Sequence, residues 1–120
     1  MKTAITKIYS FEAAHQLVGH AGKCAHLHGH SYKLEVSLSG ALIPTGSAEG
    51  MVMDFTDLSE VVKKEIIVPW DHTFLNDVVS FRTTVENLAQ EIFLRLDTSG
   101  LPVVQIRLWE TPTGFATVTR

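Results

Sequence analysis

The stretch from His28 to Gly40 alternates apolar and polar residues with period two, and this alternation constrains the fold more than any other feature. Side chains two residues apart leave a β-strand from the same face. The even positions are two histidines followed by apolar residues, and the odd positions are polar: His28, His30, Tyr32, Leu34, Val36 and Leu38 against Ser31, Lys33, Glu35, Ser37 and Ser39. The stretch therefore predicts a half-buried strand whose apolar face begins with two histidines.

A second alternating segment lies near the start of the chain. Its odd positions are mostly apolar and end in a third histidine: Ile5, Lys7, Tyr9, Phe11, Ala13 and His15, with Lys7 as the exception. If the two strands pair antiparallel, the end of the first lies beside the start of the second. We therefore expect His15 to meet His28 and His30 on the buried face, with Gly29 leaving room between the rings.

Three converging imidazoles predict a metal site. Neutral imidazole suits zinc, copper, nickel or iron, and three protein ligands plus water is the usual open form of a catalytic zinc site. We predict Zn²⁺. Two alternatives stay open, because such histidines are often satisfied in a core or a loop, and because His26, two residues before His28, could replace His15.

The only cysteine, Cys24, lies four residues before His28. As a fourth ligand it would close the site and make it structural. As a free thiolate beside a cation, it could take or deliver a proton. A lone cysteine is also often simply buried.

Composition sets the outer bounds. With 120 residues, 45% of them hydrophobic, and no low-complexity run, we expect one domain over residues 1–120 with its own core. The net charge of −3 and the lack of a Lys/Arg run argue against nucleic acid and anionic membranes as partners. The N-terminal segment lacks the apolar core of a signal peptide, and no apolar run is long enough to cross a bilayer. We expect a cytoplasmic protein.

The middle of the chain changes to helical period. After Asp54, a plausible N-cap, apolar residues recur at helical spacing and predict a helix over residues 55–67 that ends before Pro69. Thr83 to Glu86 has the spacing of a capping box, and the apolar stripe that follows predicts a second helix ended by Gly100 and Pro102.

Two further strands follow, with Val104, Ile106 and Leu108 on one face and a turn at Pro112 and Gly114 leading into residues 115–119. The order β-β-α-α-β-β favours an α+β fold, an antiparallel sheet with two helices on one face. Such a small sheet has free edges. We therefore expect a homo-oligomer whose sheets join edge to edge and can close into a barrel, against the alternative of a monomer with twisted or charged edges.

Two more positions carry candidate chemistry. Glu110 continues the apolar parity of its strand, and a buried carboxylate needs a partner, such as the guanidine-like edge of a ligand. The alternative is that the strand has bent and Glu110 is solvated. Between the helices, Asp71 and His72 could act as a proton carrier held by a carboxylate, although adjacent residues of this kind are also common in turns.

These residues together resemble a known family. The resemblance covers nearly the whole chain and is carried by the segments Phe11-Glu12-Ala13-Ala14-His15, Cys24-Ala25-His26-Leu27-His28-Gly29-His30-Ser31-Tyr32, Asp54-Phe55, Asp71-His72 and Trp109-Glu110-Thr111. They resemble the 6-pyruvoyltetrahydropterin synthase family, and within it the 6-carboxytetrahydropterin synthase branch, in which the cysteine lies four residues before the first histidine. The resemblance implies a T-fold, trimers that form a barrel, two trimers stacked as a hexamer, and active sites between subunits.

The resemblance also implies roles for individual residues. It makes His15, His28 and His30 the zinc ligands, Cys24 the general base, Asp71 and His72 a proton relay from a neighbouring subunit, and Glu110, with Thr111 beside it, the holder of the 2-amino-4-oxo edge of a pterin. The implied reaction is a lyase reaction without a redox cofactor. It converts 7,8-dihydroneopterin triphosphate to 6-carboxy-5,6,7,8-tetrahydropterin, acetaldehyde and triphosphate, a step toward queuosine and other 7-deazapurines.

The chain departs from the family pattern in two places. It reads Arg82-Thr83-Thr84 where the family commonly has Asn-Pro-Thr, and the loop from Gln16 to Lys23 is short. Arg82 is either a phosphate contact or a solvated residue at a helix start. The alternative functions are a 6-pyruvoyltetrahydropterin synthase or another pterin side-chain lyase, and a cupin-like metal-binding module. The two helical segments and the strand parity of Glu35 argue against the cupin.

Overall fold

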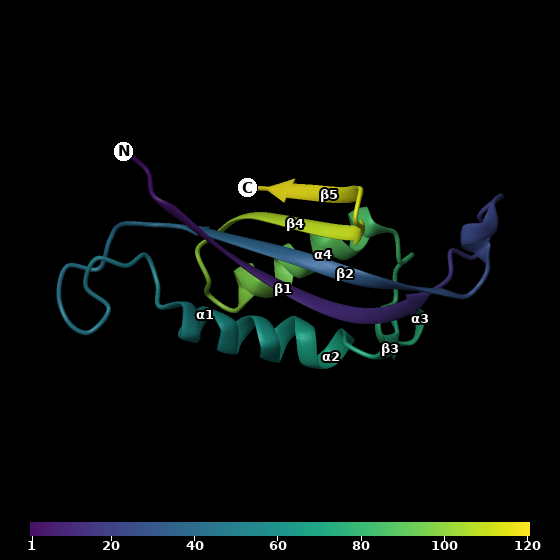
Figure 1. Cartoon of the computed structure of the whole chain (residues 1–120), viewed down its shortest axis with the longest axis horizontal. Helices are drawn as coiled ribbons and strands as arrows, with labels where there is room; N and C mark the ends of the chain where they lie inside the picture. The colour runs from purple at the N-terminus through teal and green to yellow at the C-terminus, as the bar shows by residue number, and fades with distance from the viewer.

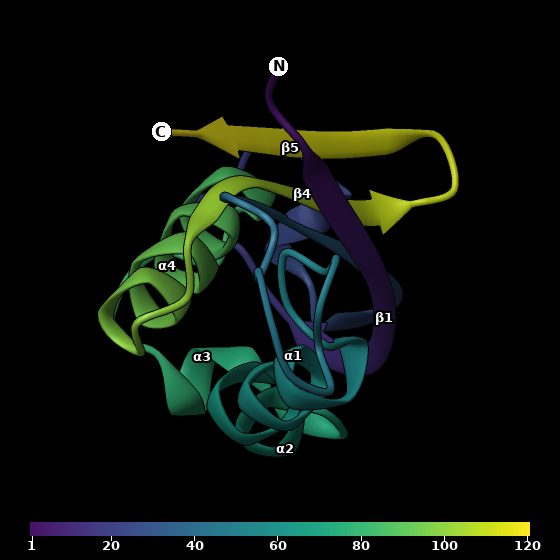
Figure 2. The same ribbon diagram turned by 90° about the vertical axis from the view of Figure 1, so that its left-hand side faces the viewer.

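A computed structural model describes all residues 1–120 as a five-stranded sheet in the order β3-β1-β2-β4-β5, with the helices on one side (Figures 1 and 2). The strands are β1 (Ala4–His15), β2 (His28–Ser39), β3 (Thr73–Phe74), β4 (Val103–Thr111) and β5 (Gly114–Thr119). The helices are α1 (Phe55–Val62), α2 (Val68–Trp70), α3 (Leu75–Val78) and α4 (Val85–Thr98). A 3-10 turn (Lys23–Ala25) precedes β2, and a π-helical turn (Lys63–Ile67) joins α1 to α2.

Strands β1 and β2 pair antiparallel over their full twelve residues, from Ala4 opposite Ser39 to His15 opposite His28. This is the pairing that the two alternating patterns predict. It places His30 opposite Ala13, one step along the same face. The histidine end of the pair lies beside β3 and α3, on the right in Figure 1.

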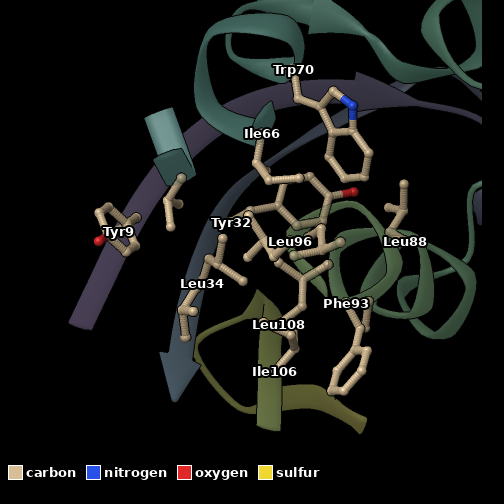
Figure 3. Packing of buried hydrophobic residues seen from close by; sticks show 14 of the residues in the cluster. Tyr9, Tyr32, Leu34, Ile66, Trp70, Leu88, Phe93, Leu96, Ile106 and Leu108 are labelled. Atoms are coloured by element: carbon tan, nitrogen blue, oxygen red, sulfur yellow. The ribbon is translucent and has the colours of Figure 1, made fainter. Parts of the chain in front are cut away.

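The predicted apolar face of the sheet forms the core with the helices. Phe11 stacks on Tyr32, with ring centroids 4.9 Å apart, and meets Trp70 edge-on at 6.1 Å. Figure 3 shows the buried side chains of α4 and of the π turn closing over β2 and β4, among them Leu88, Leu96 and Ile66. Burial of these apolar side chains is the main force that holds the helices to the sheet.

The observed fold confirms the predicted α+β class but adds two short elements. Strand β3 pairs parallel to β1, through Ala13 with Thr73 and Ala14 with Phe74, so the sheet is mixed and not purely antiparallel. A two-residue strand and the one-turn helix α3 are too short to produce a periodic pattern. A register shift opposite Ser37 and Leu38 also buries Val103, where the parity of β4 predicted Val104.

The first helical segment runs to Trp70, so the prediction that it ends before Pro69 is wrong. The π turn explains the difference, because its wider ring, with the Val68 N–H bonded to the Lys63 carbonyl, gives the proline ring room that a regular turn denies it. None of the helices combines the length and apolar composition needed to cross a lipid bilayer.

Helix α4 starts one residue later than the capping-box spacing predicts. Its N-cap is Thr84, whose Oγ1 accepts the Asn87 N–H at 3.2 Å. Thr83, the expected cap, is fully buried and its side chain lies against the histidine end of β1. The predicted C-terminal end is confirmed, because the helix ends at Thr98, just before Gly100, which has a φ of +96°.

Two residues of the first helical segment test how much the core contributes. Ile66 is fully buried, whereas Val68 is 75% exposed. We expect Ile66→Ala to lower the free energy of unfolding by about 2 to 5 kcal/mol, because it opens a cavity beneath the sheet. Val68→Ala, the matched control, should change it by less than about 0.5 kcal/mol. Urea unfolding followed by circular dichroism measures both, and equal losses would contradict this account of the core.

Candidate metal centre

The three predicted histidines converge at the end of the β1 and β2 pair. His15, His28 and His30 offer ligand nitrogens that all lie within 4.8 Å of one another. Their ring centroids are 4.6 to 5.1 Å apart, and the rings meet at steep angles. His26 lies before β2 begins and is exposed, so the alternative triad with His26 in place of His15 is not the one that forms.

Hydrogen bonds fix which ring nitrogen is free in two of the three histidines. His15 Nδ1 lies 2.8 Å from the Thr83 carbonyl, and His28 Nδ1 lies 2.7 Å from the His26 carbonyl. A carbonyl oxygen only accepts, so both Nδ1 atoms carry the proton and both Nε2 atoms keep a lone pair. His30 Nε2 is buried without a partner. The centre therefore presents Nε2 donors with no protein partner, as a divalent metal ion requires.

Burial also keeps the imidazoles in the form that binds metals. The pKa of His15 lies below its usual range because burial disfavours the charged ring, an effect partly opposed by the Thr83 carbonyl and the Glu110 carboxylate. The pKa of His30 is lowered by burial in the same way, again with Glu110 opposing. Metal binding needs neutral imidazole, so these shifts favour a loaded site near neutral pH.

Glu110 joins the centre from β4. Its Oε2 lies 3.8 Å from His15 Nε2 and 4.0 Å from His30 Nε2, and the side chain is 28% exposed. Strand β4 carries an irregularity between Trp109 and Thr111, yet the carboxylate stays on the histidine side, as the strand parity predicts. Thr111 follows at the turn, where its Oγ1 accepts the Thr113 N–H at 3.4 Å.

Cys24 lies in the 3-10 turn just before β2 and is half-buried. Its carbonyl accepts the Leu17 N–H at 2.8 Å, which ties the turn to the chain two residues after His15. The thiol is not a member of the close group of donors that the three histidines form. The arrangement is a three-donor centre, which leaves a metal ion open to a further ligand.

Asp71 and His72 contact each other through their side chains at the edge of the sheet. Asp71 Oδ1 accepts the Glu12 N–H at 2.8 Å and lies 3.0 Å from His72 Nδ1. The pKa of Asp71 is lowered chiefly by the Glu12 N–H and also by His72, so the carboxylate is ionised and holds the proton of His72 on Nδ1. His72 has a φ of +57°, a strained value for a residue other than glycine, and its side chain is 79% exposed.

Asn76 ties the segment of Asp71 and His72 to the end of β1, the strand that carries His15. Its Oδ1 accepts the Gln16 N–H at 3.0 Å, and its Nδ2 donates to the Gln16 carbonyl at 2.8 Å. With the β3 pairing and the bond from the His72 N–H to the Glu12 carbonyl, residues 71–76 follow β1 from Glu12 past His15. The relay candidates and one candidate metal ligand therefore share a single strand as their support.

Residues 4–120 match the family model described as 6-pyruvoyl tetrahydropterin synthase. The chain belongs to this family. It is 45% identical to a 6-carboxy-5,6,7,8-tetrahydropterin synthase of Haemophilus influenzae, with 92% of this chain and 94% of that protein covered. It is 43% identical to a protein of the same name from a Synechocystis species, with 93% and 89% covered. The structure of the Caenorhabditis elegans 6-pyruvoyl tetrahydropterin synthase superposes with a TM-score of 0.87 at 28% identity, covering 100% of this chain and 96% of that one.

Membership of the 6-pyruvoyl tetrahydropterin synthase family confirms the predicted T-fold and the expectation of a pterin side-chain lyase. Some residues in and around the centre do not follow from the sequence patterns. The sequence pattern predicts that Thr83 is a helix cap, whereas its side chain contacts His15. No periodic pattern indicates the bond that the Asn76 amide makes with Gln16. The buried Tyr32 hydroxyl, which has no hydrogen-bond partner, reads only as core. Burial raises the pKa of Tyr32, so this phenol stays protonated.

The lowered pKa values predict a pH dependence of the metal-free protein. Histidine has a pKa of about 6.5 when unfolded, so below about pH 6.5 the unfolded chain binds more protons than the native one. The free energy of unfolding should therefore fall as the pH drops from 7.5 to 5.5 in the presence of a chelator. His15→Gln should show a shallower fall, because it removes one of the groups with a lowered pKa.

His20→Gln is the matched control, because His20 is exposed and lies outside the centre. It should keep the parental slope of unfolding free energy against pH, measured by urea titration at each pH. A His15→Gln protein with the full parental slope would show that the centre does not cause the pH dependence.

Proposed function

We propose that the protein is a cytoplasmic, zinc-dependent lyase that converts 7,8-dihydroneopterin triphosphate to 6-carboxy-5,6,7,8-tetrahydropterin, acetaldehyde and triphosphate, a step toward queuosine and other 7-deazapurines. The observation that carries the proposal is the convergence of His15, His28 and His30 beside Glu110, in a chain similar to relatives of that name. The new carboxyl group has one oxygen more than the alcohol carbon it replaces, so one water molecule is consumed.

His15, His28 and His30 would hold the zinc ion through their Nε2 atoms. A bound zinc ion would act as a Lewis acid toward the side-chain oxygens of the substrate. The protein's own contribution is to disfavour the charged form of His15 and His30 and to fix the orientation of the His15 and His28 rings. Burial and the two carbonyl partners do this before any ligand arrives.

Cys24 would act as the general base that takes a proton from the substrate side chain. The turn that carries it ends three residues before His28 and is tied to Leu17 through the Cys24 carbonyl, and these two links to the histidine strands support the assignment. A nearby cation stabilises a thiolate, and the thiolate is the form that accepts a proton.

The pair of Asp71 and His72 would move the second proton. Asp71 keeps the proton of the ring on Nδ1, which leaves Nε2 free for exchange. The ring is largely exposed within one chain, which suits a relay that serves the thiol of a neighbouring subunit. We therefore also propose a hexamer of two stacked trimers, in which the edges that β3 and β5 leave unpaired are joined between subunits.

Glu110, with Thr111 beside it, would hold the 2-amino-4-oxo edge of the pterin ring. A carboxylate matches the paired N–H donors of that edge in a bidentate fashion. Its position against His15 and His30 would set the distance between the ring and the zinc-bound side chain. Arg82 is exposed, and we assign no role to its side chain.

A second candidate is 6-pyruvoyltetrahydropterin synthase, which is favoured by the description of the matching family and by the name of the superposed structure. The two reactions differ in their products. The position of Cys24 four residues before His28 favours the carboxylated product.

Product analysis tests the proposed reaction. Zinc-loaded protein incubated with 7,8-dihydroneopterin triphosphate should release acetaldehyde and triphosphate together with 6-carboxytetrahydropterin, identified by mass. The physical reason is that base and metal act on adjacent carbons of one side chain. A 6-pyruvoyl product with triphosphate but no acetaldehyde would instead establish the second candidate, and an unchanged substrate would remove both.

Substitution at Cys24 separates binding from turnover. Cys24→Ala should keep one zinc ion per chain and lose at least about 100-fold in kcat, the usual scale of general-base catalysis. The zinc remains because the thiol is not among the ligands. Metal content by atomic emission and turnover by acetaldehyde release measure the two effects.

Two histidine variants serve as controls for the zinc content and turnover of Cys24→Ala. His28→Ala should lose both zinc and turnover, whereas His26→Ala, which alters an exposed side chain outside the triad, should keep both. Loss of zinc in Cys24→Ala would make the thiol a ligand and contradict the assignment of an open centre.

A further inference from the structure

Thr83 contacts the candidate metal ligand His15 through two different oxygens. The His15 Nδ1 atom lies 2.8 Å from the Thr83 carbonyl oxygen and 3.2 Å from Thr83 Oγ1. Thr83 is fully buried and His15 is 1% exposed, so water does not replace either contact. One residue therefore supplies both acceptors that surround this N–H group.

The loop around Thr83 is held rigid from both sides. The Thr84 N–H donates to the Arg82 carbonyl at 2.9 Å, which closes a tight turn with Thr83 at its centre. Asn87 Nδ2 donates to the same carbonyl at 3.0 Å, and Thr84 caps helix α4. The position of Thr83 is thus set by the start of a fourteen-residue helix.

Thr83 lies at one of the two places where the chain departs from the pattern of the family it resembles. A proline, the residue the family commonly has here, offers the same carbonyl but no side-chain oxygen. In this chain the hydroxyl adds a second acceptor beside the His15 N–H. Two acceptors on one rigid residue restrict rotation of the ring and increase the electron density on the opposite nitrogen, Nε2.

We propose that the Thr83 hydroxyl is a positioning group for His15, which holds the ring in the orientation and tautomer that direct Nε2 to the metal. This inference rests on the proposed function only in taking the histidine triad as the metal site. Thr83 does not contact the metal itself. Its effect should therefore appear in metal affinity and in the geometry of the site.

Thr83→Val tests the hydroxyl with little change of shape. It replaces Oγ1 by a methyl group beside the polar Nδ1, while the backbone carbonyl contact remains. We expect the zinc affinity, measured by competition with a chromophoric chelator, to fall about tenfold, the lower end of the range for residues that orient a metal ligand. The visible absorption bands of the cobalt-substituted protein should shift, because the ring of His15 turns.

Thr83→Ser and Thr84→Val are the matched variants. Thr83→Ser keeps the hydroxyl and should restore the zinc affinity to within about twofold of the parent and the parental cobalt spectrum. Thr84→Val removes the cap hydroxyl of α4 but not the contact to His15, so it should lower the Tm and leave zinc affinity unchanged. If Thr83→Val does not fold, Thr83→Ala removes the same oxygen with a smaller side chain.

Three results would overturn the inference without affecting the proposed function. Parental zinc affinity in Thr83→Val or Thr83→Ala would show that the hydroxyl has no part in binding. A Thr83→Ser protein as weak as Thr83→Val would assign the effect to the methyl group. Equal weakening by Thr84→Val would assign it to folding of the loop. A parent protein that binds no zinc would overturn the proposed function as well, and so is distinguishable from failure of this inference alone.

Discussion

The antiparallel pairing of β1 with β2 is the constraint on which both the core and the metal centre depend. Its register places Phe11 and Tyr32 in the core and, further along the same face, His15 opposite His28. A slip of one residue would turn every one of these side chains to the other face of the sheet. The same apolar burial that stabilises the fold therefore fixes the register that gathers the imidazoles.

Burial of the centre carries a cost that a bound ion would offset. A buried polar atom without a partner destabilises the native state, and His30 Nε2 is such an atom. The hydrogen bonds of His15 and His28 direct their own Nε2 atoms into the same space and leave them unpaired by the protein. These unpaired nitrogens therefore lower the stability of the native state when no metal is bound. This is the pattern expected where binding of a metal contributes to folding.

The sequence was sufficient for the parts that depend on periodicity. The alternation in β1 and β2 predicts the strands, their pairing and the convergence of His15 with His28, and parity predicts the side of Glu110. It fails where short elements or long-range contacts decide the outcome. Strand β3 exists only because β1 offers it an edge, and Thr83 serves His15 because Thr84 takes the cap. Only Thr83 has the capping-box spacing, with Glu86 three residues later, so the pattern alone does not show that Thr84 is the cap and that Thr83 contacts His15.

Strand β1 supports two kinds of chemistry on its two sides. Its side chains contribute His15 to the centre, while its backbone at Glu12 and Gln16 holds the segment of Asp71 and His72 through an ionised carboxylate and the amide of Asn76. Backbone groups of a paired strand are among the least mobile in a protein, which makes them suitable for holding a strained residue such as His72. His72 is held there by the bond from its own N–H to the Glu12 carbonyl and by its contact with Asp71, so the strained backbone at His72 is sustained by β1 and by its neighbour in the chain.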